Sequence, residues 1–127
     1  MKTFSILFVD DMTFYRSLIQ DHLKLWAHPV NLTYCTNAMD AIDKLKEGNF
    51  DLIISDLMMP KHTGYDLLKS VRKSAKYKDV PFVMLSSQEN QKVILKIIET
   101  GADEYLNKPW DVPDVHRVLN KFLLKEG

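Results

Sequence analysis

Acidic residues at the ends of two apolar runs are the groups in this sequence best suited to chemistry. Asp10 and Asp11 follow the run 4–9, and Asp56 follows the run 52–55. If these carboxylates meet they repel one another, and one lysine cannot neutralise three negative charges. Carboxylate oxygens suit a hard divalent cation such as magnesium, whereas calcium would require a fuller cage of protein oxygens. The three aspartates therefore predict a magnesium site, provided that the fold brings them together.

Asp10 and Asp11, taken as an isolated pair, have a simpler explanation. Asp11 would cap the helix that follows, and Asp10 would be a solvated loop residue. Other polar residues favour the chemical interpretation because they also end apolar runs. Ser86 follows one such run, and Lys108 follows another.

Five short runs rich in apolar, β-branched and aromatic residues predict strands, and five longer stretches of helical periodicity alternate with them. The expected strands are residues 4–9, 30–35, 52–55, 81–85 and 104–106. The expected helices are residues 13–26, 38–47, 64–73, 88–100 and 113–124. The third and fourth strands are almost continuously apolar, which is typical of parallel strands that helices cover on both faces.

This alternation predicts an α/β fold: a three-layer, flavodoxin-like, doubly wound (βα)5 domain with a parallel five-stranded sheet of order 2-1-3-4-5. Such sheets bind ligands at the carboxyl ends of their strands, beside the point where the strand order reverses. Here that point lies between the first and third strands, which end at Asp10, Asp11 and Asp56. We therefore expect these carboxylates to converge, with Ser86 and Lys108 on the same rim.

Length and composition indicate a single domain over residues 1–127. A chain of 127 residues, 46% of them apolar, can bury one core but is short for two domains. The formal net charge of zero gives no basic field for nucleic acid. The apolar run 80–85 is far shorter than the roughly 20 residues that span a bilayer, so no membrane insertion is expected. One cysteine, Cys35, and a start without a leader-like apolar stretch favour a reducing cytoplasm.

Across nearly its whole length the sequence resembles the receiver domain of bacterial two-component response regulators, of the chemotaxis type. Five segments carry the resemblance, and they occur in the order and at the strand ends that the family requires. They are Phe8-Val9-Asp10-Asp11, the stretch from Asp51 to Pro60, Gly64-Tyr65-Asp66-Leu67-Leu68, the serine after Met84-Leu85, and the stretch from Gly101 to Pro109.

The resemblance implies a role for each residue of the rim. Asp56 would be the nucleophile that accepts a phosphoryl group. Asp11 and Asp56 would bind magnesium directly, together with the backbone carbonyl of Met58, while Asp10 would act mainly through a metal-bound water. Lys108 would hold phosphoryl oxygens during transfer. Without the family, Lys108 would be an ordinary surface lysine.

The resemblance also implies a conformational switch. The Ser86 hydroxyl would bond to the phosphoryl group, and Tyr105 would move into the space that this shift vacates. Without the family, Ser86 would be a strand-end residue that satisfies a backbone group, and Tyr105 a half-buried sheet tyrosine.

Two of the expected helices carry more apolar surface than one buried stripe requires. In the fourth helix these residues are Val93, Ile94, Leu95, Ile97 and Ile98, and in the first they are Phe14, Tyr15, Leu18, Ile19, Leu23 and Trp26. In the family the first helix receives the histidine-containing phosphodonor, and the fourth would form an output face. The plainer alternative is that both helices are simply well buried.

These inferences predict a receiver that takes a phosphoryl group from a histidine kinase or a histidine phosphotransfer protein, in a magnesium-dependent reaction. Its change of conformation would regulate a downstream protein or an output domain outside this chain, and a dimer on phosphorylation is a further option. It would catalyse only its own phosphorylation and dephosphorylation and is otherwise not expected to be an enzyme.

The strongest alternative is a receiver-like module that binds proteins constitutively and without phosphorylation. A magnesium phosphatase fits less well, because such enzymes usually need a second acid two residues after the nucleophile, where this chain has Met58. A flavin or nucleotide carrier fits poorly, because the four glycines form no phosphate-binding loop. Trp110 replaces the more usual phenylalanine after Lys-Pro, and the four histidines, which lack metal-ligand spacing, are expected at the surface or an interface.

Overall fold

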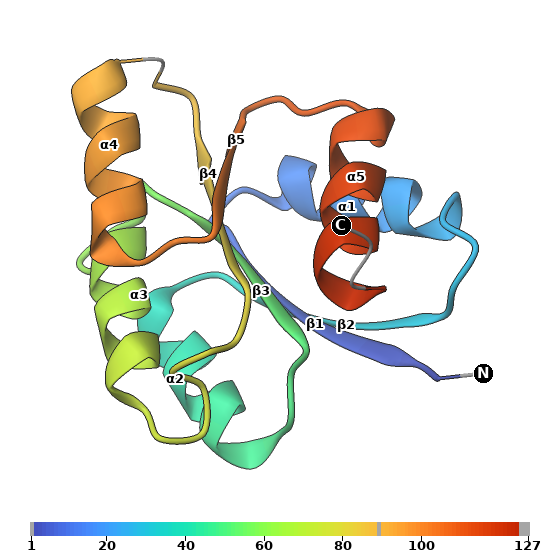
Figure 1. Cartoon of the computed structure of the whole chain (residues 1–127), viewed down its shortest axis with the longest axis horizontal. Coiled ribbons are helices and arrows are strands. Elements are labelled where there is room, and N and C mark those ends of the chain that lie inside the picture. The colour runs from blue at the N-terminus through green and yellow to red at the C-terminus, as the bar shows by residue number, and fades with distance from the viewer. Residues whose placement is uncertain (1, 89, 125–127) are drawn as a thin grey trace.

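The computed structural model describes residues 2–88 and 90–124, in which strands and helices alternate along the chain (Figure 1). The strands are β1 (Phe4–Val9), β2 (Val30–Cys35), β3 (Leu52–Asp56), β4 (Phe82–Ser86) and β5 (Glu104–Asn107). The helices are α1 (Thr13–Lys24), α2 (Ala38–Glu47), α3 (Gly64–Lys73), α4 (Gln91–Thr100) and α5 (Val112–Leu123).

The five strands form one parallel sheet of order β2-β1-β3-β4-β5, which confirms the predicted flavodoxin-like topology. In the register between β1 and β3, Val9 lies opposite Ser55. Asp10 and Asp56 follow these two residues, so both aspartates leave the sheet at the same edge.

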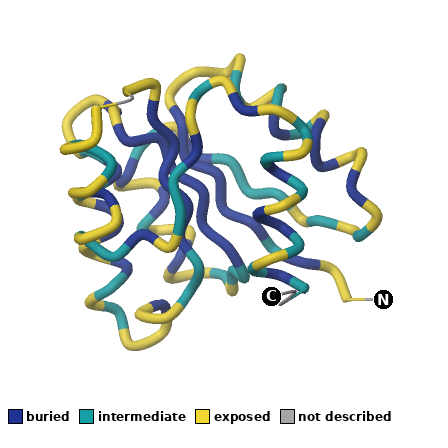
Figure 2. Tube along the Cα trace, turned by 45° about the horizontal axis from the view of Figure 1, so that its top comes forward, coloured by how far each residue is buried: buried dark blue, intermediate teal, exposed yellow. Residues whose placement is uncertain are grey.

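Helices cover both faces of the sheet, with α1 and α5 on one side and α2, α3 and α4 on the other (Figure 1). Successive residues of a strand point to opposite faces. In β1, Ile6 and Phe8 accordingly pack toward α1 and α5, whereas Leu7 and Val9 pack toward the other helices. Every residue of β3 and β4 is buried, as their apolar composition predicted (Figure 2).

Two helix ends differ from the sequence-based expectation by more than one residue. α4 begins at Gln91 rather than at residue 88, because the side chain of Asn90 accepts the N–H of Lys92 at 2.8 Å and caps the helix. Residue 89, also expected in this helix, lies outside the described residues. α1 ends at Lys24 rather than at residue 26, because the chain tightens there and the N–H of Trp26 donates to the carbonyl of Leu23.

Other helix ends agree with the residues found there. Gly101 follows α4 with a φ of 119°, a left-handed conformation that glycine adopts without steric cost. Asp111 precedes α5 and forms a capping box with Asp114, with Pro113 in the first turn. No helix within the described ranges has the length and apolar character to cross a membrane.

Gly64 lets α3 begin in direct contact with the end of β3. Its N–H donates to the carbonyl of Leu57 at 2.8 Å. A Cβ atom at this position would lie 2.5 Å from the backbone oxygen of Asp56 and 2.6 Å from the sulfur of Met84. The loop between β3 and α3 therefore folds back over the strand end that carries Asp56.

We predict that Gly64→Ala destabilises the fold by roughly 1–3 kcal/mol, because the backbone oxygen of Asp56 cannot move away from the added methyl group as a flexible side chain could. Urea unfolding measures the change. Gly48→Ala is the matched control, since the nearest atom to its Cβ would be a ring carbon of Phe50 at 3.2 Å. Equal losses of stability in the two variants would contradict this account of the loop.

Candidate functional site

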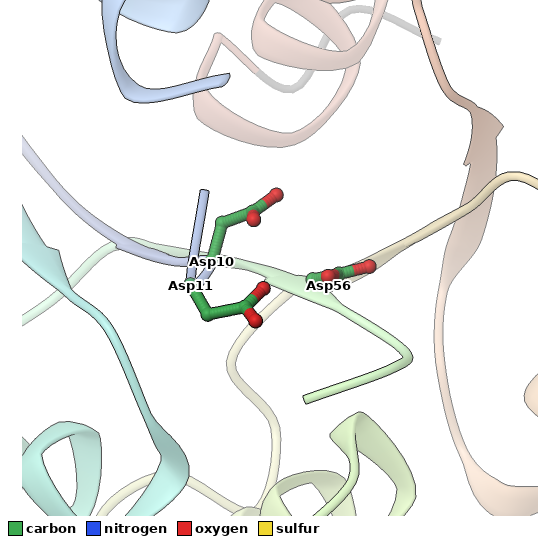
Figure 3. A group of neighbouring side chains, drawn as sticks. All are labelled: Asp10, Asp11 and Asp56. Atoms are coloured by element: carbon green, nitrogen blue, oxygen red, sulfur yellow. The ribbon is translucent and has the colours of Figure 1, made fainter. Parts of the chain in front are cut away.

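Asp10, Asp11 and Asp56 meet at the carboxyl edge of the sheet (Figure 3). Each offers a carboxylate oxygen, and these oxygens all lie within 4.8 Å of one another. Asp10 and Asp56 are 0% and 5% exposed, whereas Asp11 is exposed. The predicted convergence is confirmed, and the cluster opens to solvent on the side of Asp11.

Backbone and side-chain bonds hold Asp10 in place at the end of β1. Its N–H donates to the carbonyl of Cys35 at 3.0 Å, and its own carbonyl accepts the hydroxyl of Tyr34 at 2.7 Å. Its Oδ1 accepts the N–H of Met12 at 2.9 Å. The simpler explanation for Asp11 is wrong, because the residue that caps α1 is Met12, which makes no side-chain capping bond.

Lys108 supplies the positive charge of the cluster. Its Nζ lies 2.9 Å from Oδ2 of Asp10 and 3.2 Å from Oδ1 of Asp56. Its N–H donates to the carbonyl of Ser86 at 3.0 Å, which ties the residue to the end of β4, and the Lys108–Pro109 peptide bond is cis. The side chain is 6% exposed, so Lys108 is not an ordinary surface lysine.

Burial and unbalanced charge perturb both partners of the Asp56–Lys108 pair. Burial raises the pKa of Asp56 from 3.8 to about 6; the charge of Asp10 adds to this effect, and Lys108 opposes it. Burial acts to lower the pKa of Lys108, but its contacts with Asp10 and Asp56 outweigh burial and raise that pKa above its ordinary value. Two buried carboxylates thus share a single ammonium group, and the carboxylate of Asp11 lies beside them.

This arrangement suits a hard divalent cation. Asp10 Oδ2 is buried and has no well-aligned hydrogen bond within residues 2–88 and 90–124. Its 2.9 Å contact with Lys108 is therefore an ion pair without good hydrogen-bond geometry. A cation on the open side, near Asp11 and Asp56, would supply the positive charge that the lysine cannot.

A family model of the response regulator receiver domain matches residues 6–120. This chain belongs to that family. Receiver domains of the family accept a phosphoryl group in two-component signalling, and this is the function of the chain.

Curated relatives of this receiver domain include plant proteins. The two-component response regulator ORR3 of Oryza sativa subsp. indica is 35% identical over 121 residues, which cover 94% of this chain and 91% of the relative. ORR12 of Oryza sativa subsp. japonica is 36% identical over 121 residues, 94% of this chain and 98% of the relative.

Solved bacterial structures share the fold. Chemotaxis protein CheY4 of Vibrio cholerae matches with a TM-score of 0.85 at 27% identity, over 95% of this chain and 99% of that chain. The receiver domain of sensor histidine kinase PA1611 from Pseudomonas aeruginosa PAO1 matches with a TM-score of 0.85, over 96% of this chain and 98% of that chain. At 21% identity the second likeness shows the fold alone.

The remaining predicted residues of the receiver domain lie around the acidic cluster. Ser86 is buried at the end of β4, and its hydroxyl accepts the N–H of Gln88 at 3.0 Å, so it does satisfy a backbone group. Met58 follows β3 with an exposed side chain. Its backbone N–H bonds to Asp56 and so offsets part of the rise in the pKa of that carboxyl group. Tyr105 is half-buried on β5 and its hydroxyl donates to the side chain of Asn107.

The two helices with surplus apolar surface each leave part of it in solvent. On α4, Leu95 and Ile98 are 58% and 44% exposed, while Ile97 is buried. On α1, Phe14 is 61% exposed and Ile19 is buried. The interpretation that both helices are simply well buried is therefore wrong.

Sequence reasoning missed an aromatic group that joins α1 to the loop after β5. Trp110 is buried and its indole N–H donates to Nδ1 of His22 at 3.1 Å. Of the two places expected for His22, the surface or an interface, the structure excludes the surface, because the ring is buried with the Trp110 indole as its polar partner. Tyr15 also belongs to this group, since the Nζ of Lys108 lies 3.9 Å from the centroid of its ring. The signal was the spacing of Tyr15 and His22, which puts both on one face of a helix.

The raised pKa of Asp56 predicts that this residue destabilises the metal-free fold at neutral pH. The folded protein binds the Asp56 proton more tightly than the unfolded chain does. Tighter binding of this proton stabilises the fold. The stabilisation is complete below about pH 4, where Asp56 is protonated, and is lost as the pH rises through about 6. The side chain of Asp56→Asn stays neutral at all of these pH values. At pH 7.5 its free energy of unfolding should exceed that of wild type by up to roughly 3 kcal/mol, whereas near pH 4 the two proteins should be equally stable.

Urea unfolding in the presence of a chelator, repeated across this pH range, measures the difference. Asp21→Asn, at an exposed position of α1, is the matched control and should follow wild type. A gain from Asp56→Asn that is the same at all pH values would contradict the assignment to this carboxyl group.

Proposed function

We propose that Asp56 is the phosphoryl acceptor of this receiver domain, which forms a single unit over residues 1–127. The position of its carboxylate is the observation that carries the proposal. Asp56 ends the central strand β3, is 5% exposed and has one oxygen 3.2 Å from the ammonium group of Lys108. A carboxylate held against a fixed cation, at the open edge of a sheet, suits attack on a phosphoryl group.

Transfer needs one bond to form and one to break. A carboxylate oxygen of Asp56 attacks the phosphorus, while the bond from phosphorus to the histidine nitrogen of the donor breaks. That nitrogen keeps the bonding electrons, and the product is an acyl phosphate. Because no general acid or base is required, placement and charge carry the rate. Lys108, already in contact with Asp56, would neutralise an oxygen of the transferred group.

Magnesium is the cation that we propose for the acidic cluster. Its ligands would be Asp11, Asp56 and the backbone carbonyl of Met58, with Asp10 acting through a bound water. When bound, it would supply positive charge to the phosphoryl oxygens. Magnesium keeps several waters and shares phosphate oxygens, which suits a cluster open on the side of Asp11. The PA1611 receiver domain, which has this fold, holds magnesium in its active-site cleft.

We also propose that Ser86 and Tyr105 transmit the phosphorylation signal. Ser86 ends β4, the neighbour of β3, and its hydroxyl now accepts the N–H of Gln88. Exchange of that partner for a phosphoryl oxygen would move the loop that leads to α4. Tyr105 lies on the next strand, where its bond to Asn107 holds the hydroxyl near the surface. Inward movement of Tyr105 would change the face shared by β5 and α4.

A histidine kinase or histidine phosphotransfer protein is the donor that the family implies. We propose the surface of α1 near Phe14 as its docking site, and the exposed α4 residues Leu95 and Ile98 as the surface for a downstream protein or for a second copy on phosphorylation. An output domain outside this chain is the other proposed target. No direct contact with nucleic acid is proposed.

We also propose a cellular location and a subclass for this receiver domain. The single, buried Cys35 supports a cytoplasmic location. The likeness to CheY4 supports the bacterial, chemotaxis-type subclass, whereas the rice relatives match at higher identity. As a catalyst the domain would act only on its own phosphorylation and dephosphorylation. The comparisons do not favour the constitutive binding module.

Intact mass spectrometry tests the acceptor directly. After incubation with magnesium and phosphoramidate or acetyl phosphate, wild type should gain one phosphoryl group that is stable in acid and labile in base. Asp56→Asn should gain none, because it lacks the nucleophile. Lys108→Met should form the same adduct more slowly, since it removes positive charge but leaves the acceptor intact. An adduct of equal yield in Asp56→Asn would refute the assignment.

A further inference from the structure

We propose that Tyr15 is a positioning residue that holds Lys108 over the acidic cluster through the face of its ring. The inference rests on the role proposed above for Lys108. Tyr15 lies in the first turn of α1, and the Nζ of Lys108 lies 3.9 Å from its ring centroid. A cation at this distance from an aromatic face is attracted by the ring quadrupole, whose negative lobe lies over the face.

The ammonium group of Lys108 is enclosed by three partners. Asp10 and Asp56 contact it at 2.9 Å and 3.2 Å, and the ring of Tyr15 lies against it as well. The lysine side chain is 6% exposed. A cation–π contact is stronger where water is excluded, so the ring strengthens the hold on the ammonium group. It also provides an apolar wall against which the flexible lysine side chain is confined.

Other aromatic residues fix the ring of Tyr15. The centroid of the Trp110 ring lies 5.5 Å from that of Tyr15, with an angle of 37° between the two ring planes. The centroid of the Phe14 ring lies 5.1 Å from that of Tyr15, and these two rings meet edge to face. Trp110 is 3% exposed and contacts the ring of Phe8 in the sheet core. Its indole N–H is bonded to His22, so the indole that supports Tyr15 has a fixed orientation.

The contacts form two matched pairs between α1 and the loop after β5. Tyr15 and His22 lie seven residues apart on one face of the helix, and Lys108 and Trp110 lie two residues apart in the chain. Tyr15 contacts Lys108, and His22 bonds to Trp110. This arrangement limits the motion of Lys108 before a phosphoryl group arrives. The lysine side chain therefore loses less conformational entropy when it binds the phosphoryl oxygens during transfer. The arrangement also links the lysine to α1, the helix proposed to receive the donor.

Phosphorylation rates of two variants test the role of the ring. With phosphoramidate and saturating magnesium, Tyr15→Leu should react roughly tenfold more slowly than wild type, because leucine keeps apolar bulk but has no π face. Tyr15→Phe keeps the ring and should retain most of the rate. In a Lys108→Met background, Tyr15→Leu should cause no further loss, since its effect acts through the lysine. Tyr15→Met replaces Tyr15→Leu if the leucine variant does not fold.

A second measurement needs neither magnesium nor a phosphodonor. Labelling of the metal-free protein with an amine-reactive reagent, followed by peptide mass spectrometry, reports how accessible the Lys108 amine is. Tyr15→Leu should increase labelling of Lys108 several-fold, and Tyr15→Phe should not. Lys24 and Lys46, both exposed, are internal references whose labelling should be the same in all variants.

Unchanged rate and unchanged Lys108 labelling in Tyr15→Leu would overturn the proposal. A loss of rate that is equally large in the Lys108→Met background would also overturn it, because the effect would not pass through the lysine. These outcomes differ from failure of the proposed function, in which wild type itself would gain no phosphoryl group. In that case the labelling comparison still decides whether Tyr15 holds Lys108.

Discussion

The close approach of three carboxylates, two of them in contact with one ammonium group, is the interaction on which the site depends. Like charges at this separation repel, and burial of Asp10 and Asp56 strengthens the repulsion because little water screens it. Burial, and after it the repulsion from Asp10, raises the pKa of Asp56 to about 6. A fold that keeps such a cluster together must hold its members rigidly, and the cluster in turn favours a cation, whose positive charge would balance the excess of carboxylates.

The parallel sheet provides this rigidity. Two adjacent central strands deliver Asp10 and Asp56 to one edge, and β5 delivers Lys108 to the same edge from two strands beyond β3. Neighbouring elements then limit each side chain: Tyr34 of β2 bonds to the carbonyl of Asp10, and Tyr15 of α1 lies against Lys108. The Ser86 hydroxyl, by contrast, accepts only the N–H of Gln88 within the part of the chain that the structure describes, and a phosphoryl oxygen could replace that partner in the switch proposed above.

The fold and the meeting of the charged residues were predictable from sequence because both follow from local pattern. Alternating apolar runs identified the strands, and the strand order then required Asp10, Asp11 and Asp56 to converge. The contact of Tyr15 with Lys108 was not predictable, since it depends on side-chain orientation between segments far apart in the chain. The burial of His22, expected at the surface or an interface, was not predictable either, because its polar partner, an indole N–H, is equally remote in sequence.

Magnesium titration of the unfolding temperature tests most directly whether carboxylate crowding creates a cation site. At pH 8, magnesium should stabilise wild type in proportion to the logarithm of its concentration once the site is saturated. Asp11→Asn removes one carboxylate from the open side, so it should weaken magnesium affinity by roughly tenfold or more. Asp21→Asn, at an exposed position outside the cluster, should respond as wild type does. Equal stabilisation of Asp11→Asn and wild type, or no stabilisation of wild type, would contradict this account of the site.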